Sequence, residues 1–146
     1  MAAVDGSQRK AVVASLFRLY SSGQYATANR TLLEENGLWE IKPRSVGGLR
    51  SLAEHNKYLA EVMPDFAEFA ITPHLVVYEE LPGGEGVVFA SCTSRAQHRT
   101  NGVYGQDYVF TFHFRPHSLR VSKVTEFVDS HYSARFFAKK SKRASL

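Results

Sequence analysis

Several features that mark common classes of protein are missing from this sequence. Its single cysteine, Cys92, leaves no partner for an internal disulfide and excludes a site built from several cysteines. No apolar run approaches the ~20 residues that cross a bilayer as a helix, so we expect no membrane contact. The opening residues MAAVDGSQRK lack the apolar core of a signal peptide, so we expect a cytoplasmic protein.

Acidic residues are absent from the end of the chain. The last eight residues hold four basic side chains and no acid, and without them 14 basic residues balance 14 acidic ones. The four are Lys139, Lys140, Lys142 and Arg143. A neutral body lacks the basic patch of a nucleic-acid-binding surface, so we expect no nucleic-acid partner. We interpret residues 133–146 as a flexible basic tail and residues 1–7 as a flexible N-terminus, which leaves one domain at 8–132.

What is present is a clear change of apolar periodicity along the chain. Helical spacing predicts three helices, at 8–22, 25–33 and 49–62. A short extended segment at 38–41 lies between the second and third of them. Long extended runs follow, at 66–79, 87–100, 104–115 and 119–129. Pro73 indicates that the first run is an edge strand or contains a bulge. Helices followed by strands indicate an α+β fold, with three N-terminal helices packed on one face of a curved antiparallel sheet.

The segment at 103–129, VYGQDYVFTFHFRPHSLRVSKVTEFVD, is the most informative. Alternate side chains of its first strand share one face of the sheet and are large. They are Tyr104, Gln106, Tyr108, Phe110, Phe112 and Phe114. On the next strand, Glu126 shares a face with Val124 and Val128, so we expect this carboxylate to be buried. Tyrosine hydroxyls above phenylalanines, beside a carboxylate, are typical of a pocket for a small molecule.

The order of these segments resembles the SnoaL-like, nuclear-transport-factor-2-like (NTF2-like) superfamily. The resemblance rests on two helices, a segment with Trp39, a third helix ending in MPDF and a last strand reading RVSKVTEFVD, and it covers residues 8–130. It implies a cone-shaped barrel. Tyr104, Tyr108 and Glu126, at spacings of four and eighteen, resemble the site of small fungal enzymes of alkaloid and meroterpenoid biosynthesis. Arg30 resembles the pocket arginine of those enzymes.

The resemblance implies a cofactor-free isomerase, a semipinacolase that rearranges an oxidised indole alkaloid. Such a rearrangement needs an acid at the departing oxygen and a base at the hydroxyl that becomes a carbonyl, and it needs neither a metal nor a redox cofactor. We assign Glu126 as base or electrostatic partner, and Arg30 as the group that holds Glu126 or binds the substrate oxygen. Tyr104 and Tyr108 are assigned as hydrogen-bond donors. The expected substrate-binding residues are Trp39, His55, Phe110 and Phe112.

Two other functions stay open, because this fold hosts unrelated activities. One is a dehydratase or cyclase of a polyketide or meroterpenoid intermediate that uses the same glutamate and tyrosines. The other is a binding module without catalysis.

The opposite face of the predicted sheet is too apolar for a free surface. It carries Leu75, Val77, Phe89, Thr93, Val109, Thr111 and His113. We expect this face to form a symmetric homodimer.

Overall fold

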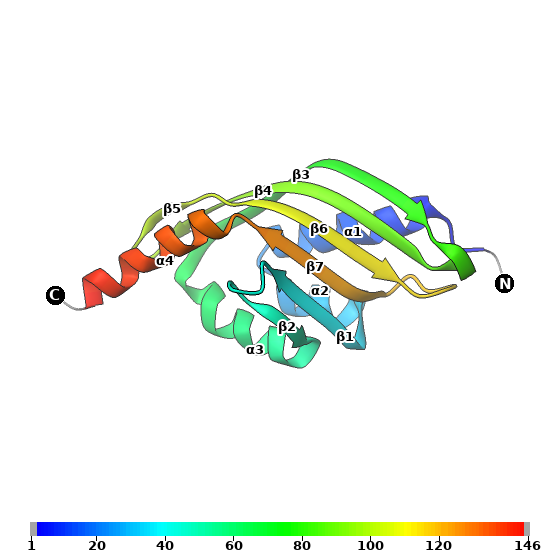
Figure 1. Cartoon of the computed structure of the whole chain (residues 1–146), viewed down its shortest axis with the longest axis horizontal. Coiled ribbons are helices and arrows are strands. Elements are labelled where there is room, and N and C mark those ends of the chain that lie inside the picture. The colour runs from blue at the N-terminus through cyan, green and yellow to red at the C-terminus, as the bar shows by residue number, and fades with distance from the viewer. Residues whose placement is uncertain (1–2, 145–146) are drawn as a thin grey trace.

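A computed structural model describes the backbone of residues 3–144 and the side chains of residues 3–139. Its α-helices are α1 (Gly6–Ser21), α2 (Tyr25–Leu32), α3 (Leu52–Val62) and α4 (Ser130–Ala144). Its strands are β1 (Leu33–Lys42), β2 (Gly48–Ser51), β3 (Phe66–Glu80), β4 (Gly86–His98), β5 (Gly102–Tyr104), β6 (Asp107–Phe114) and β7 (Val121–Val128). Figure 1 shows the sheet arching over α1, α2 and α3, with the chain ends at opposite ends of the molecule. No helix in the described part of the chain is long and apolar enough to cross a bilayer.

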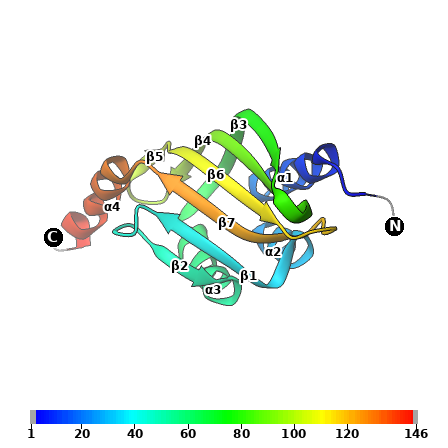
Figure 2. The ribbon, with the colours of Figure 1, turned by 45° about the vertical axis from the view of Figure 1, so that its right-hand side comes forward.

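The strands form one curved, mixed sheet in the order β2-β1-β7-β6-β4-β3, with β5 paired to β4. The antiparallel meander of β3, β4, β6 and β7 confirms the prediction from the sequence. Pro73 lies in the edge strand β3 and beside a shift of register, so both readings of this proline are confirmed. The prediction missed that β1 pairs in parallel with β7 and continues the sheet to β2 (Figure 2). Parallel pairing depends on residues far apart in the sequence, so local periodicity gives no sign of it.

Local capping signals fix where two of the helices begin. The Asp5 side chain accepts from Gln8 N at the start of α1, and the Gln8 side chain accepts from Asp5 N. Ser51 and Glu54 form the same reciprocal pair at the start of α3. The helix predicted from residue 49 therefore begins at Leu52, because the residues before it pair as β2.

The core lies between α1 and the concave face of the sheet. Phe17 packs edge-on against Phe110 and Phe112, with ring centroids 5.6 and 5.5 Å away. The six alternating side chains that the sequence placed on one face are all buried, which confirms that prediction. The strand itself is interrupted between β5 and β6. There the Gln106 backbone oxygen still accepts from Ser94 N over 2.9 Å, and the Gln106 side chain donates from Nε2 to Ser133 Oγ over 2.7 Å.

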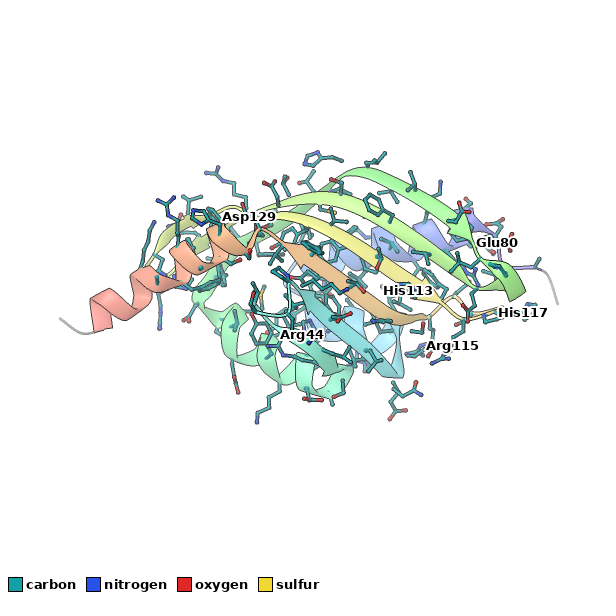
Figure 3. All side chains as sticks on the ribbon, in the orientation of Figure 1. Arg44, Glu80, His113, Arg115, His117 and Asp129 are labelled. Atoms are coloured by element: carbon teal, nitrogen blue, oxygen red, sulfur yellow. The ribbon has the colours of Figure 1, made fainter. Side chains whose placement is uncertain are left out.

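The C-terminal segment departs most from the prediction. We expected a flexible tail from residue 133, but residues 130–144 form α4. Asp129 begins this helix by accepting from Tyr132 N over 3.0 Å, at the junction labelled in Figure 3. Phe136 is buried and packs against Tyr104 with ring centroids 5.0 Å apart, which ties the helix to the sheet. Three of the four basic side chains in the last eight residues lie outside the described residues, namely those of Lys140, Lys142 and Arg143.

Arg9 closes the end of the sheet that lies away from α4. It is only 1% exposed, although no sequence pattern singled it out. Its guanidinium donates to the carbonyl oxygens of Gly84, Arg115 and Ser118 over 2.9–3.3 Å and to the Tyr78 hydroxyl over 2.8 Å. The Arg9 guanidinium therefore donates hydrogen bonds to backbone oxygens in the turns that follow β3 and β6.

Candidate active site

An apolar cavity of about 130 Å³ lies between the helices and the concave face of the sheet. Side chains from α1, α3 and α4 and from β1, β3, β5, β6 and β7 form its walls. Val46 and Phe137 line it and are 39% and 38% exposed, so they mark its mouth. An engineered cavity of ~150 Å³ holds benzene, so this space is close to the size of a single six-membered ring. Any larger ligand must extend through the mouth.

Glu126 is the one acidic residue among the described residues that line this cavity. Its Oε1 accepts a hydrogen bond from Trp39 Nε1 over 3.1 Å. Burial raises the pKa of the Glu126 carboxyl to about 7, while the Trp39 hydrogen bond and the positive charge of Arg50 oppose the rise. Both protonation states are therefore populated near neutral pH, which suits a group that must accept and release a proton.

Tyr104 and Tyr108 line the same cavity as Glu126, as the sequence predicted. Burial raises the pKa of Tyr104 to about 12, and hydrogen bonding to Tyr108 opposes it. Burial, followed by the neighbouring Tyr104 and Glu126, raises the pKa of Tyr108 well above its ordinary value. The Tyr108 hydroxyl lies 3.0 Å from Ser94 Oγ. Both phenols therefore stay protonated at neutral pH and remain hydrogen-bond donors.

His55 lies flat against Trp39, with ring centroids 4.0 Å apart and planes 10° from parallel. It projects into the cavity from α3 and is 2% exposed. Burial lowers the pKa of His55 to about 3, and the charge of Arg50 lowers it further. The imidazole is therefore neutral at any working pH.

Two predicted site residues lie elsewhere. Phe112 is fully buried and packs on Phe17, but it does not line the cavity, so its assignment to substrate binding is corrected to the core. Arg30 is exposed on α2 and lines a separate surface hollow, so it does not lie beside Glu126 as expected. The inner face of α2 presents Ala28 and Asn29, and each further residue turns by ~100°, which carries Arg30 away from the core.

The arginine that acts on the cavity is Arg50, which the sequence analysis did not select. Its guanidinium carbon lies 4.3 Å above the ring of Tyr58, a lining residue. Its charge opposes the rise in the pKa of both Glu126 and Tyr58. Arg50 lies on β2 and directly precedes Ser51, the cap of α3, so its place is decided by the pairing of β2 with β1.

The structure also shows a polar chain that leads away from the cavity. Tyr20 lines the cavity, and its hydroxyl donates to Asn29 Oδ1 over 2.5 Å. Asn29 is fully buried, and its Nδ2 donates to Asn56 Oδ1 over 2.7 Å. Tyr20 also packs edge-on against Trp39, with ring centroids 6.1 Å apart. This network therefore fixes one side of the indole that bonds to Glu126.

No group of three or more histidine, cysteine, aspartate or glutamate residues that could hold a metal occurs among the residues the structure describes. His113 and His117 are four apart in the sequence, but one lies on β6 and the other in the turn after it. Figure 3 shows both beside Arg115 at the end of the sheet that lies away from α4, and neither lines the cavity.

Comparison with known proteins identifies solved structures of the same fold but no protein of similar sequence. No protein-family model matches the sequence, and no curated protein sequence matches it. The structure matches the BvnE pinacolase from Penicillium brevicompactum with a TM-score of 0.82 and 17% identity, over 96% of this chain and 98% of that one. PrhC from Penicillium brasilianum matches with a TM-score of 0.82 and 15% identity, over 94% and 91%. An NTF2-like protein from Burkholderia pseudomallei matches with a TM-score of 0.65 and 16% identity, over 88% and 96%. These matches confirm the expected fold.

Proposed function

We propose that this chain of NTF2-like fold is an enzyme that rearranges a largely apolar, oxygenated substrate by acid–base chemistry without a cofactor. The observation that carries the proposal is the placement of Glu126 in an aromatic cavity. Burial raises its pKa to about 7, and the protonated Tyr104 and Tyr108 line the same space. A carboxyl group that exchanges its proton near neutral pH, beside two donors, supplies what an acid–base rearrangement requires.

Within this class we propose a semipinacol-type isomerisation of an oxidised indole alkaloid, an epoxide or a hydroxyindolenine, to a spiro-indoxyl type product. In a hydroxyindolenine, the hydroxyl loses its proton to Glu126 as its carbon becomes a carbonyl. A neighbouring carbon substituent migrates with its electron pair to the imine carbon, and the imine nitrogen gains a proton. The product therefore has the formula and oxidation state of the substrate. Each tyrosine that donates to a developing charge contributes about 3 kcal/mol to such a step.

The shape of the cavity supports an aromatic substrate. Trp39 and Phe110 line it with aromatic rings, and its volume is close to that of a single six-membered ring. The exposed Val46 and Phe137 leave room at the mouth for the remainder of an alkaloid. The likeness of the fold to that of a pinacolase is the reason to favour rearrangement over other acid–base reactions.

The test is turnover of an indole 2,3-epoxide or a 3-hydroxyindolenine alkaloid by the purified protein without added cofactor or metal. We expect a product of unchanged mass. Glu126→Gln and Tyr108→Phe should each lower kcat/KM by about a hundredfold or more. Glu61→Gln, on the exposed side of α3, and Tyr25→Phe, outside the cavity, should leave the rate unchanged.

The other two functions give different results in the same experiment. A product lighter by one water, formed from a hydroxylated substrate, would establish a dehydratase that uses the same residues. Saturable binding with no product from any of these substrates would favour the binding module and contradict the proposed enzyme.

A further inference from the structure

Three buried side-chain nitrogens have no hydrogen-bond partner in the described part of the chain. They are both ring nitrogens of His55 and Nη1 of Arg50. Buried polar groups in folded proteins are hydrogen-bonded in the large majority of cases, so each exception requires an explanation. These exceptions share one location, because His55 lines the cavity and Arg50 packs over Tyr58, which lines it too.

Packing alone does not account for a histidine at this position. The ring of His55 stacks on Trp39, and a phenyl ring would provide the same contact. The two nitrogens add nothing to this stack and carry a desolvation cost without a protein partner. A group with this cost, in a cavity wall, is positioned to bind a ligand.

The charge state of His55 limits the chemistry of that ligand. Burial and the charge of Arg50 lower the pKa of His55 to about 3, so one ring nitrogen donates and the other accepts. A pKa this low also makes His55 a poor proton acceptor at neutral pH, which separates its role from that of Glu126. The charged group that acts on it is Arg50, and Glu126 lies at the edge of the same indole, where it accepts from Trp39 Nε1.

Charge balance favours an uncharged partner above the pKa of Glu126. There the charges of Arg50 and of ionised Glu126 cancel, so an uncharged ligand leaves the site neutral. A carboxylate would add a negative charge beside Glu126, and an ammonium group would add a positive charge beside Arg50, each without solvent to screen it. An amide is uncharged and offers both an N–H and a C=O, so it has a partner for either ring nitrogen in either tautomer.

We propose that His55 is the specificity-determining anchor for an uncharged amide-type group of the substrate. Assigning this group to the substrate rests on the proposed function, whereas the binding itself requires no catalysis. Trp39 stacks on His55 and donates to Glu126, so one indole holds the anchor and the acid–base group at a fixed spacing. A substrate bound through its amide at His55 would therefore meet Glu126 at a set distance along its skeleton.

Benzamide, benzoate and isopropylbenzene test this anchor, because they have the same number of non-hydrogen atoms and differ in charge and hydrogen bonding. Binding is followed by the fluorescence of Trp39, the only tryptophan of the chain. We expect His55→Phe to weaken benzamide binding about tenfold, equivalent to about 1.4 kcal/mol, and to leave isopropylbenzene binding unchanged or tighter. His55→Gln, which keeps a neutral donor and acceptor, should restore most of the benzamide affinity. His131→Phe, at an exposed position on α4, should change neither.

Benzamide affinity that is unchanged by His55→Phe, or that falls together with isopropylbenzene affinity, would overturn the anchor. So would tighter binding of benzoate than of benzamide, or failure of benzamide to bind the wild type. Nitrogen NMR of the wild type is a check that needs no variant, since benzamide and not isopropylbenzene should shift the His55 ring resonances. Selective binding of the amide without turnover would support the anchor and contradict the isomerase. Turnover without amide selectivity would support the isomerase and contradict the anchor.

Discussion

Trp39 Nε1 donates to Glu126 Oε1 over 3.1 Å, although 87 residues separate the two in the chain. The parallel pairing of β1 with β7 brings them together, with Trp39 opposite Val124 and Ile41 opposite Glu126. The bond stabilises the ionised carboxylate in surroundings that otherwise favour its protonated form. The Trp39 indole thus opposes the rise in the pKa of Glu126 through its N–H and stacks on His55 through its ring face.

The buried carboxyl predicts a pH-dependent cost to stability. Because the pKa of Glu126 is raised to about 7 in the folded state, the folded protein binds this proton more tightly than the unfolded chain. The favourable contribution of this proton to the free energy of unfolding is complete below pH 4.5 and is lost as the pH rises through 7. Glu126→Gln does not ionise, so its free energy of unfolding relative to wild type should rise by roughly 2–3 kcal/mol between pH 4.5 and 8. Urea titrations at several pH values measure this, and a pH-independent difference would contradict it.

Removing the donor on Trp39 should raise the pKa of Glu126 further. Trp39→Phe keeps an aromatic ring against His55 but deletes the N–H that bonds to the carboxylate. Since a hydrogen bond to a charged group contributes about 1.5–3 kcal/mol, the pKa should move up by about one to two units. The midpoint of the pH–kcat/KM profile, or a direct NMR titration of the carboxyl, reports this shift. A midpoint that stays the same or moves down would show that the bond does not tune Glu126.

Arg9 is expected to be essential for stability and irrelevant to chemistry. Arg9→Met leaves three carbonyl oxygens and the Tyr78 hydroxyl without their buried donor. We expect the free energy of unfolding to fall by about 3 kcal/mol, measured by urea denaturation. The exposed neighbour Lys10→Met is the control and should change it little. Because Arg9 does not line the cavity, kcat of the folded fraction should be unchanged, and a selective loss of kcat would place it in the site.

The convex face of the sheet is proposed to be a homodimer interface. Leu75, Val77, Val109 and Phe127 are 53%, 46%, 38% and 50% exposed on this face, and Val109 lies directly opposite Phe127. An apolar surface of this kind favours association with a second copy. Light scattering after size exclusion should give a dimer for the wild type and a monomer for Val109→Glu. Lys57→Glu, on the exposed side of α3, should stay dimeric, whereas a monomeric wild type would refute the proposal.

Much of the cavity wall could be predicted because it depends on local rules. Alternation along β6 placed Tyr108 and Phe110 on one buried face, and the same period on β7 placed Glu126 inward. Phe112 obeys that alternation too, yet it lies in the core, because periodicity gives the face of a strand and not the position of a cavity along it.

The sequence by itself determined that three helices precede a four-strand meander, which face of that meander points inward, and that a glutamate shares this face with tyrosines. The spacing between nearby residues encodes these features, so they can be predicted without knowledge of contacts between distant segments. The tertiary structure alone decided that β1 pairs with β7, that Arg50 and not Arg30 acts on Glu126, and that α4 packs beside the mouth. Each of these depends on contacts between segments far apart in the chain, whose free energy is set by packing and not by local propensity.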